Sequence, residues 1–146
     1  MLAPDVNVLV YAHRVDSIAD HRSYARWVTE LATGREPFAL SVLALAGLVR
    51  VVTNPRIFPR ASSVGEAFAF VSELATRPQA RLIRPGPDHL TILEELCRAS
   101  GATGKLVADA QHAAVAIENG CTLVTTDSDF DRFPGLRWRH PLRPND

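Results

Sequence analysis

The sequence predicts an α/β fold in which helices cover both faces of a central, mainly parallel sheet, a three-layer α/β/α arrangement. Two observations lead to this prediction. Short apolar segments rich in β-branched residues alternate with longer segments of helical periodicity. The chain has 146 residues, 47% of them hydrophobic, which suits one sizeable core. We therefore expect a single domain over residues 1–142 and a loose tail over residues 143–146.

The N-terminal part predicts a strand, a helix and a second strand. Residues 2–12 are almost wholly apolar, with valine at three alternate positions. This pattern is typical of a strand buried on both faces. Residues 18–33 have the periodicity of an amphipathic helix, which Gly34 ends. Residues 37–40 are a candidate for the second strand.

The middle of the chain predicts two helices and a strand. Ser41 is placed to cap a very apolar helix over residues 42–52, which an Asn-Pro dipeptide ends. Residues 63–76 predict the next helix, because its first four residues, Ser-Val-Gly-Glu, form a capping box. Residues 80–84 predict a short strand.

The C-terminal part repeats the alternation. Asp88 is placed to cap a helix over residues 89–100, and another helix is expected over residues 105–118. An apolar, β-rich segment at residues 121–126 predicts a strand. A short helical turn and a last strand over residues 136–140 complete the fold.

Charge and cysteine content exclude several classes of protein. The 16 basic and 16 acidic residues give no net charge, so any contact with nucleic acid must come from a local patch. Cys97 and Cys121 form no CxxC pair, which argues against a disulfide framework or a structural zinc site. With no basic leader and no apolar run of transmembrane length, we expect a cytoplasmic protein.

Three carboxylates stand where the fold alone does not call for them. Asp5 interrupts the first predicted strand, Asp109 lies inside a helix on a small apolar face, and Asp127 directly follows a strand. Each has another explanation, because Asp5 and Asp127 could cap helices and Asp109 could be exposed. Ligand sites of open α/β sheets lie beyond the carboxyl ends of the strands, so we expect the three to converge there.

Such a cluster predicts metal-dependent chemistry on phosphate. Mg²⁺ and Mn²⁺ prefer oxygen ligands and combine one or two carboxylates with waters and substrate phosphate. A bound ion activates a water and neutralises charge on a phosphate. We therefore predict that Asp5, Asp109 and Asp127 are catalytic and hold one or two divalent ions. Asn7 and Thr126 are expected to support these carboxylates from a second layer.

The same segments resemble the motifs of the PIN-domain ribonucleases, and specifically those of the VapC toxins. Residues 4–9 resemble the first motif, an Asp followed two positions later by Asn. Residues 106–116 resemble the helix of the third acid, and residues 124–130 the motif of the fourth acid. The resemblance extends over residues 48–58, 133–138 and 141–142, so it spans nearly the whole chain in the right order.

The resemblance implies a Mg²⁺- or Mn²⁺-dependent endoribonuclease that inhibits translation by cutting structured RNA, commonly tRNA or ribosomal RNA. It also implies a homodimer that a cognate VapB-type antitoxin silences by placing its tail in the active site. A haloacid-dehalogenase-like phosphohydrolase is a weaker alternative, because that chemistry needs an acid where this chain has Asn7.

One departure from the family leaves a second hypothesis open. Gly47 stands where the family usually has a second acid, a Glu, and residues 37–65 contain no acidic residue. Asp129, water or RNA phosphate could complete the metal shell. The alternative is a degenerate domain that binds RNA or antitoxin without cleavage. We favour retained activity, because the other three acids are present.

Basic residues near the predicted site are candidates for binding RNA. Arg50 and Arg56 lie near the end of the second helix, and Lys105 precedes Asp109 by one helical turn. His112 follows Asp109 by three positions, and we expect it on the helix surface rather than in the site.

Overall fold

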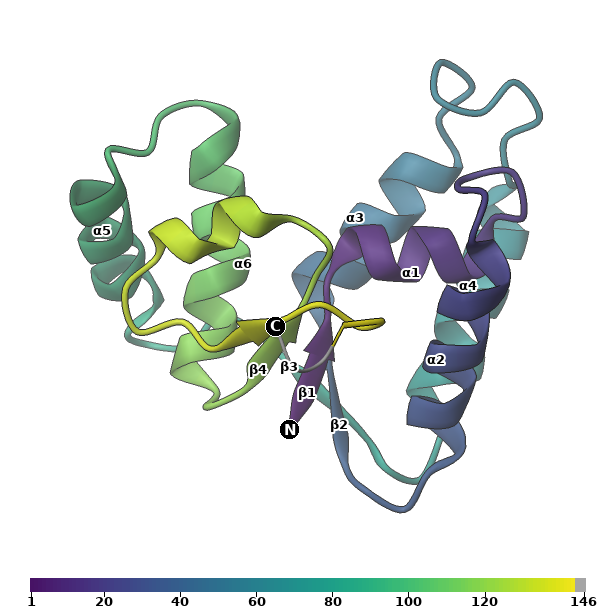
Figure 1. Ribbon diagram of the computed structural model, residues 1–146, viewed down its shortest axis with the longest axis horizontal. Coiled ribbons are helices and arrows are strands. Elements are labelled where there is room, and N and C mark those ends of the chain that lie inside the picture. The colour runs from purple at the N-terminus through teal and green to yellow at the C-terminus, as the bar shows by residue number, and fades with distance from the viewer. Residues whose placement is uncertain (144–146) are drawn as a thin grey trace.

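The computed structural model describes residues 1–143 and contains a five-stranded, all-parallel sheet in the order β3-β2-β1-β4-β5 (Figure 1). This confirms the predicted fold class. The strands are β1 (Leu2–Pro4), β2 (Phe38–Ser41), β3 (Ala80–Ile83), β4 (Thr122–Val124) and β5 (Trp138–Arg139). The helices are α1 (Val6–His13), α2 (His21–Thr33), α3 (Val42–Val52), α4 (Val64–Ala75), α5 (His89–Ser100), α6 (Lys105–Glu118) and the 3₁₀ turn η1 (Ser128–Arg132).

Two hydrophobic cores lie on opposite faces of the sheet. Alternate side chains of β2 serve both, because Phe38 and Leu40 pack among residues of α1 to α4, whereas Ala39 packs with α5 and α6. In Figure 1, α5 and α6 lie on the left of the sheet and α1 to α4 on the right. Each face of the parallel sheet is therefore covered by helices, as such sheets require.

The prediction of one strand over residues 2–12 is wrong beyond Pro4. The chain leaves β1 there, and Asp5 caps α1, which begins at Val6. Half of the residues of α1 are buried and the others are partly buried, so apolar residues are needed on nearly every side of the helix. A short apolar run of this kind has no period that separates helix from strand. Asn7 thus lies in the first turn of a helix and not on a strand.

The other helices begin and end close to the predicted residues. The capping box is confirmed: Glu66 N–H donates to Ser63 Oγ (3.0 Å), and Ser63 N–H donates to Glu66 Oε1 (3.1 Å). Ser41 and Asp88 precede their helices, but the expected side-chain caps are wrong, because neither makes a cap hydrogen bond. Arg143 pairs with His140 in an isolated bridge, and residues 144–146 of the expected tail lie outside the described residues.

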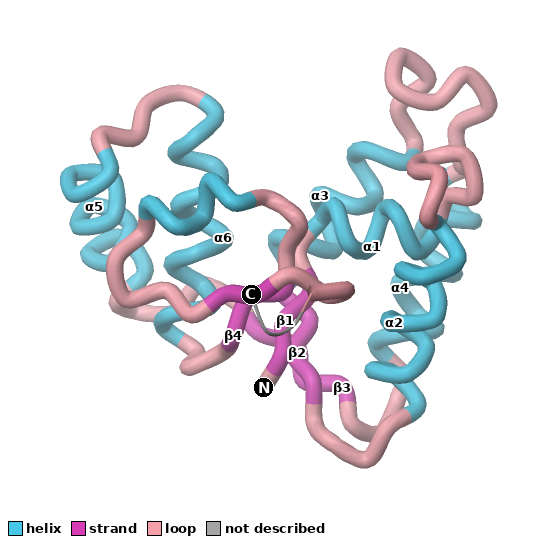
Figure 2. The backbone as a smooth tube through the Cα atoms, viewed as in Figure 1, coloured by secondary structure: helices cyan, strands magenta, loops and turns pink. Residues whose placement is uncertain are grey.

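Two loops meet beyond the end of α1. Residues 14–20 join α1 to α2, and residues 53–63 join α3 to α4; Figure 2 shows both as neighbouring loops at one end of the molecule. A hydrogen bond from Arg14 to Ser62 connects them. Among residues 1–143, no helix has the length and apolar character needed to cross a bilayer.

Candidate active site

Asp5 lies at the carboxyl end of β1, in the middle of the sheet. Its backbone N–H donates to the carbonyl of Val124 in β4 (2.9 Å), and its Oδ1 accepts from Val6 N–H (2.8 Å) at the start of α1. The side chain is only 6% exposed. The positive end of the α1 dipole compensates part of the cost of burying a carboxylate. The turn from β1 to α1 therefore fixes this acid at the expected edge of the sheet.

Thr125 is the residue that ties the carboxylates together. Its buried hydroxyl donates to Asp5 Oδ2 (2.8 Å) and accepts from Asp127 N–H (3.2 Å) and from Asn7 Nδ2 (3.3 Å). An ionised carboxylate can only accept a hydrogen bond, and a backbone N–H can only donate one. The hydroxyl proton of Thr125 therefore points toward Asp5. Thr125 was not predicted, and its neighbour Thr126 was expected in this role instead. The signal in the sequence was a hydroxyl residue two positions before Asp127.

Asp127 follows β4 and has two roles in the geometry. Its Oδ1 accepts from Asp129 N–H (2.9 Å), so it caps η1, and its side chain also lines the cleft beside Asp5. Asp129 is placed differently. Its carboxylate is exposed, lies 4.0 Å from Arg132 and is not among the groups that line this cleft. The structure thus brings Asp127, but not Asp129, together with the other acids.

Asp109 reaches the cleft from α6. Burial raises its pKa above the ordinary value of 3.8, and the nearby carboxylates of Asp127 and Asp5 raise it further. Burial also raises the pKa of Asp5, against the opposing effects of His112 and the hydrogen bond from Thr125. The charge of Asp127 thus raises the pKa of both other carboxylates, so the three lie close together. His112 lines the same cleft, which corrects the expectation that it lies on the helix surface.

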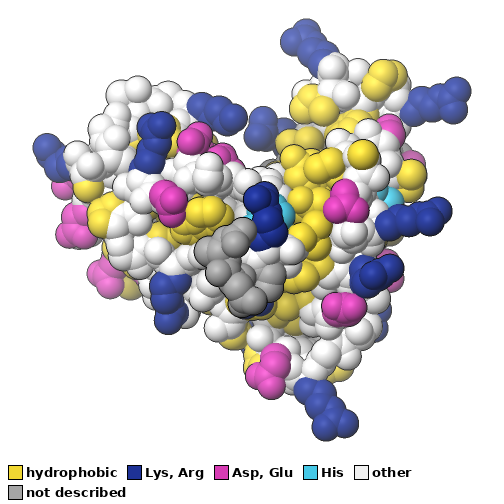
Figure 3. Space-filling view, viewed as in Figure 1, with side chains coloured by type: hydrophobic (Ala, Val, Ile, Leu, Met, Phe, Trp, Pro, Cys, Tyr) yellow, Lys and Arg dark blue, Asp and Glu magenta, His cyan; other side chains and the backbone are white. Residues whose placement is uncertain are grey.

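The cleft has a volume of about 610 Å³ and three kinds of lining. Asp5, Asp109 and Asp127 line it together with a fourth acid, Asp16. Arg50 and Lys105 add positive charge, whereas the third predicted RNA contact, Arg56, does not reach it. An apolar wall comes from α1, from the end of α3 and from the loop that follows it. Figure 3 shows hydrophobic side chains gathered in a band over the α1 side of the molecule. That wall consists of Val10, Tyr11, Val51, Ile57, Phe58 and Pro59.

Gly47 has a structural reason to be glycine. A Cβ built at this position in α3 would lie 2.7 Å from Cγ2 of Val6. Real Cβ atoms do not approach other atoms so closely, so Val6 occupies the space through which any longer side chain would pass. The position where the family usually has its second acid is therefore filled by close packing between α3 and the start of α1.

The donor set fits a hard divalent cation held in part by the protein. Within residues 1–143, no three His, Cys, Asp or Glu side chains are grouped closely enough to form a complete metal site. Mg²⁺ and Mn²⁺ do not need one, because they are commonly bound by one or two carboxylates with waters and substrate phosphate. The raised pKa values of Asp5 and Asp109 mark carboxylates that a cation would stabilise in their ionised form.

Comparison with known proteins finds similarity along nearly the whole chain. The PIN-domain family matches residues 2–136. Ribonuclease VapC43 of Mycobacterium tuberculosis is 44% identical over 142 residues, 97% of this chain and 96% of that protein. Ribonuclease VapC25 of the same organism is 40% identical over 141 residues, 97% of this chain and 99% of that protein.

Solved structures share the fold at lower sequence identity. One chain of VapBC2 from Rickettsia felis, bound to a DNA fragment from its promoter, has a TM-score of 0.68 and 22% identity, and the match covers 95% of this chain and 97% of that one. The sarcin-ricin loop cleaving toxin VapC20 of Mycobacterium tuberculosis has a TM-score of 0.66 and 18% identity, over 94% of this chain and 99% of that one.

Proposed function

Because this chain belongs to the PIN-domain family and to its VapC group, we propose that it is the toxin of a type II toxin–antitoxin pair and a Mg²⁺- or Mn²⁺-dependent endoribonuclease. One observation carries the proposal. Asp5, Asp109 and Asp127 come from three separate elements and line a single cleft with two cationic side chains. Their arrangement supports the hydrolysis of a phosphodiester.

The residues of the cleft have separate roles in this reaction. Asp5, Asp109 and Asp127 would hold the divalent ion, which supplies an activated water and neutralises charge on the phosphate when bound. Thr125 holds Asp5 through its hydroxyl, and Asn7 holds Thr125. Lys105 and Arg50 line the same cleft and would bind phosphates of the RNA backbone. Asp129 is left out of the proposed metal-binding set, because its carboxylate lies outside the cleft.

The proposal extends to target and partners. The RNA would be structured, a tRNA or a ribosomal RNA, and its cleavage in the cytoplasm would inhibit translation; the sarcin-ricin loop activity in the name of VapC20 supports this class. A VapB-type antitoxin as partner is supported by neighbours solved as VapBC complexes. A homodimer is proposed from the family resemblance.

Gly47 supports a second candidate function, a domain that binds RNA or antitoxin without cleavage. Val6 packs against Gly47 and occupies the space that the side chain of the usual second acid would need. Asp5, Asp109 and Asp127 are nevertheless present in the cleft, and a hard cation needs only one or two carboxylates. We therefore favour the nuclease over the binding module.

Cleavage of a labelled tRNA mixture by the purified, antitoxin-free chain tests the proposal. We expect cleavage that needs Mg²⁺ or Mn²⁺, stops in EDTA and is lost in Asp5→Asn and Asp109→Asn. Asp88→Asn is the matched control, because Asp88 is exposed at the start of α5 and makes no side-chain cap. Cleavage by Asp109→Asn at the wild-type rate in limiting metal would show that the assignment is wrong.

A further inference from the structure

The apolar wall of the cleft has no role in the metal chemistry. Ile57 is a large hydrophobic side chain that is 50% exposed, yet it lies in the same cleft as the carboxylates. Tyr11 is half-buried and lines the same cleft, and Phe58 is buried behind the surface. An exposed apolar surface inside a charged cleft is unfavourable in water, which indicates that it contacts a ligand.

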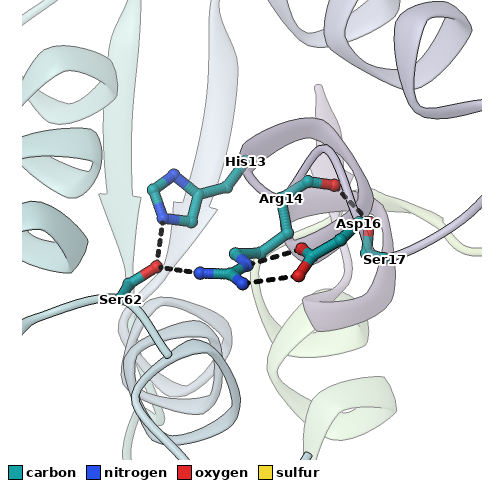
Figure 4. Close-up of polar contacts among 5 residues, drawn as sticks. All are labelled: His13, Arg14, Asp16, Ser17 and Ser62. Atoms are coloured by element: carbon teal, nitrogen blue, oxygen red, sulfur yellow. Dashed lines mark hydrogen bonds and ion pairs between the residues drawn. The ribbon is translucent and has the colours of Figure 1, made fainter. Parts of the chain in front are cut away.

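Arg14 holds the loop that forms this wall. Its Nε and one terminal nitrogen donate to the two oxygens of Asp16 at 2.8 and 2.7 Å, and its other terminal nitrogen donates to Ser62 Oγ at 3.1 Å (Figure 4). The centre of the guanidinium lies 4.5 Å from the centroid of the Phe58 ring. One side chain, only 13% exposed, thus connects the loop after α1 to both the end and the middle of the loop over residues 53–63.

Further contacts fix the ends of the same loop. Ser62 is buried, its N–H donates to the carbonyl of Val52 (2.8 Å), and its hydroxyl lies 3.1 Å from His13 Nε2. Figure 4 shows His13 and Arg14 approaching Ser62 from the end of α1. With its end anchored, the loop presents Ile57, Phe58 and Pro59 to the cleft in one arrangement.

The three linings of the cleft together match a nucleotide. Carboxylates with a divalent ion and the cations Arg50 and Lys105 suit phosphate, and an apolar wall suits the flat face of a base. A base inside a duplex has both faces stacked on its neighbours, so only an unpaired base can offer a face to this wall. The antitoxin tail expected to enter the cleft is the other candidate for this wall, and loss of antitoxin binding alone in Ile57→Ser would identify it.

We propose that Tyr11 and Ile57, supported from behind by the buried ring of Phe58, form a subsite for one unpaired base next to the cleaved phosphate, and that Arg14 is the positioning residue that holds this subsite. The inference rests on the proposed ribonuclease function and names the part of the RNA that the cleft selects. Lysine cannot replace Arg14, because it lacks the planar fork that pairs with Asp16 while it contacts Ser62 and Phe58.

The base-binding role is tested with two probes of equal charge. Fluorescence anisotropy measures binding of a random-sequence single-stranded RNA and of a chain of the same length that lacks all bases. Both are measured in Ca²⁺, which binds oxygen ligands in looser geometry than Mg²⁺. We expect the wild type to prefer the RNA about 10-fold, as for one stacked base. Ile57→Ser should lose most of this preference and keep its affinity for the baseless chain.

Leu90→Ser is the matched control, because Leu90 is an exposed hydrophobic residue of α5 outside the cleft. Its preference for RNA should equal that of the wild type. Equal wild-type affinity for the two probes, or an unchanged preference in Ile57→Ser, would overturn the subsite. So would an Ile57→Ser variant that binds both probes normally but no longer binds its VapB-type antitoxin, because the wall would then be a protein-binding surface.

The positioning role of Arg14 is tested with Arg14→Lys, compared with Arg98→Lys in the exposed pair that Arg98 makes with Glu94. We expect Arg14→Lys to reduce the preference for RNA and to raise KM for cleavage several-fold, with kcat and Mn²⁺ affinity unchanged. Wild-type KM in Arg14→Lys, or an equal loss of Mn²⁺ affinity, would refute this role. A wild type that neither binds Mn²⁺ nor cleaves RNA would refute the nuclease itself, so the two failures are distinguishable.

Discussion

Gly47 and Val6 lie against each other where α3 passes the start of α1, next to the capping residue Asp5. The distance of 2.7 Å between a Cβ built at position 47 and Val6 Cγ2 is about 1 Å shorter than an ordinary carbon–carbon contact. Gly47→Ala adds only this one carbon. The added methyl can be accommodated only if Val6 or the two helices move.

Two opposing effects set the size of the change. Replacing a glycine inside a helix by alanine stabilises the helix by about 1 kcal/mol. Overpacking in a close-packed region costs about 1–3 kcal/mol. We therefore expect Gly47→Ala to lower the free energy of unfolding by about 1 kcal/mol. In a Val6→Ala background the steric conflict is absent, so the same change should raise the free energy of unfolding by about 1 kcal/mol.

Urea denaturation of the wild type, both single variants and the double variant measures this reversal of sign. The interaction energy between the two sites should be about 2 kcal/mol, well above the error of such cycles. If Gly47→Ala has the same effect in both backgrounds, the packing argument is wrong. The same packing affects the metal site: Gly47→Glu alone should not tighten Mn²⁺ binding, whereas Gly47→Glu combined with Val6→Ala should tighten it.

Three further predictions concern the buried carboxylates. Thr125→Ala leaves Asp5 Oδ2 without its buried donor, so the free energy of unfolding should fall by about 1–3 kcal/mol in urea denaturation, and Mn²⁺ should bind more weakly in calorimetry; wild-type values for both would contradict the assigned hydrogen bond. Because folding raises the pKa of Asp5, the folded state holds that proton more tightly than the unfolded state, and stability is lost as pH rises through the raised pKa. Asp5→Asn removes this loss and should gain in melting temperature relative to the wild type between acidic and neutral pH; a constant difference across that range would refute it. Mn²⁺ binds ionised carboxylates, and the pKa values of Asp5 and Asp109 are raised. The affinity for Mn²⁺ should therefore keep rising with pH above the range in which an ordinary Asp is already ionised. An affinity that levels off near pH 5 would show that the raised pKa values do not govern metal binding.

The parts of the fold that could be predicted are those with a clear period or cap. The amphipathic and apolar helices from α3 to α6 begin and end near the expected residues, because each has a terminating Gly or Asn or a capping pattern in the sequence. The turn at Asp5 could not be predicted in this way. A short helix that is buried on most sides has the composition of a central strand, and only tertiary packing decides between them.

Some residues of the candidate site could also be predicted from the sequence, and others could not. The three carboxylates could be found from sequence because acids are costly in apolar segments and stand out. Thr125 and His112 could not, since a hydroxyl after a strand and a histidine on a helix are ordinary residues until the strands and α6 meet. The role of Arg14 depends on two loops distant in sequence, and no local pattern marks such a contact.

The central claim is that carboxylates from the ends of β1 and β4 and from α6 hold one divalent cation site. Isothermal titration of Mn²⁺ into the antitoxin-free protein tests it most directly, with Asp109→Asn and the control Asp88→Asn measured alongside. The account predicts binding by the wild type and by Asp88→Asn, and at least about 10-fold weaker binding by Asp109→Asn. Equal affinity of the wild type and Asp109→Asn, or the absence of wild-type binding even with RNA present, would contradict it.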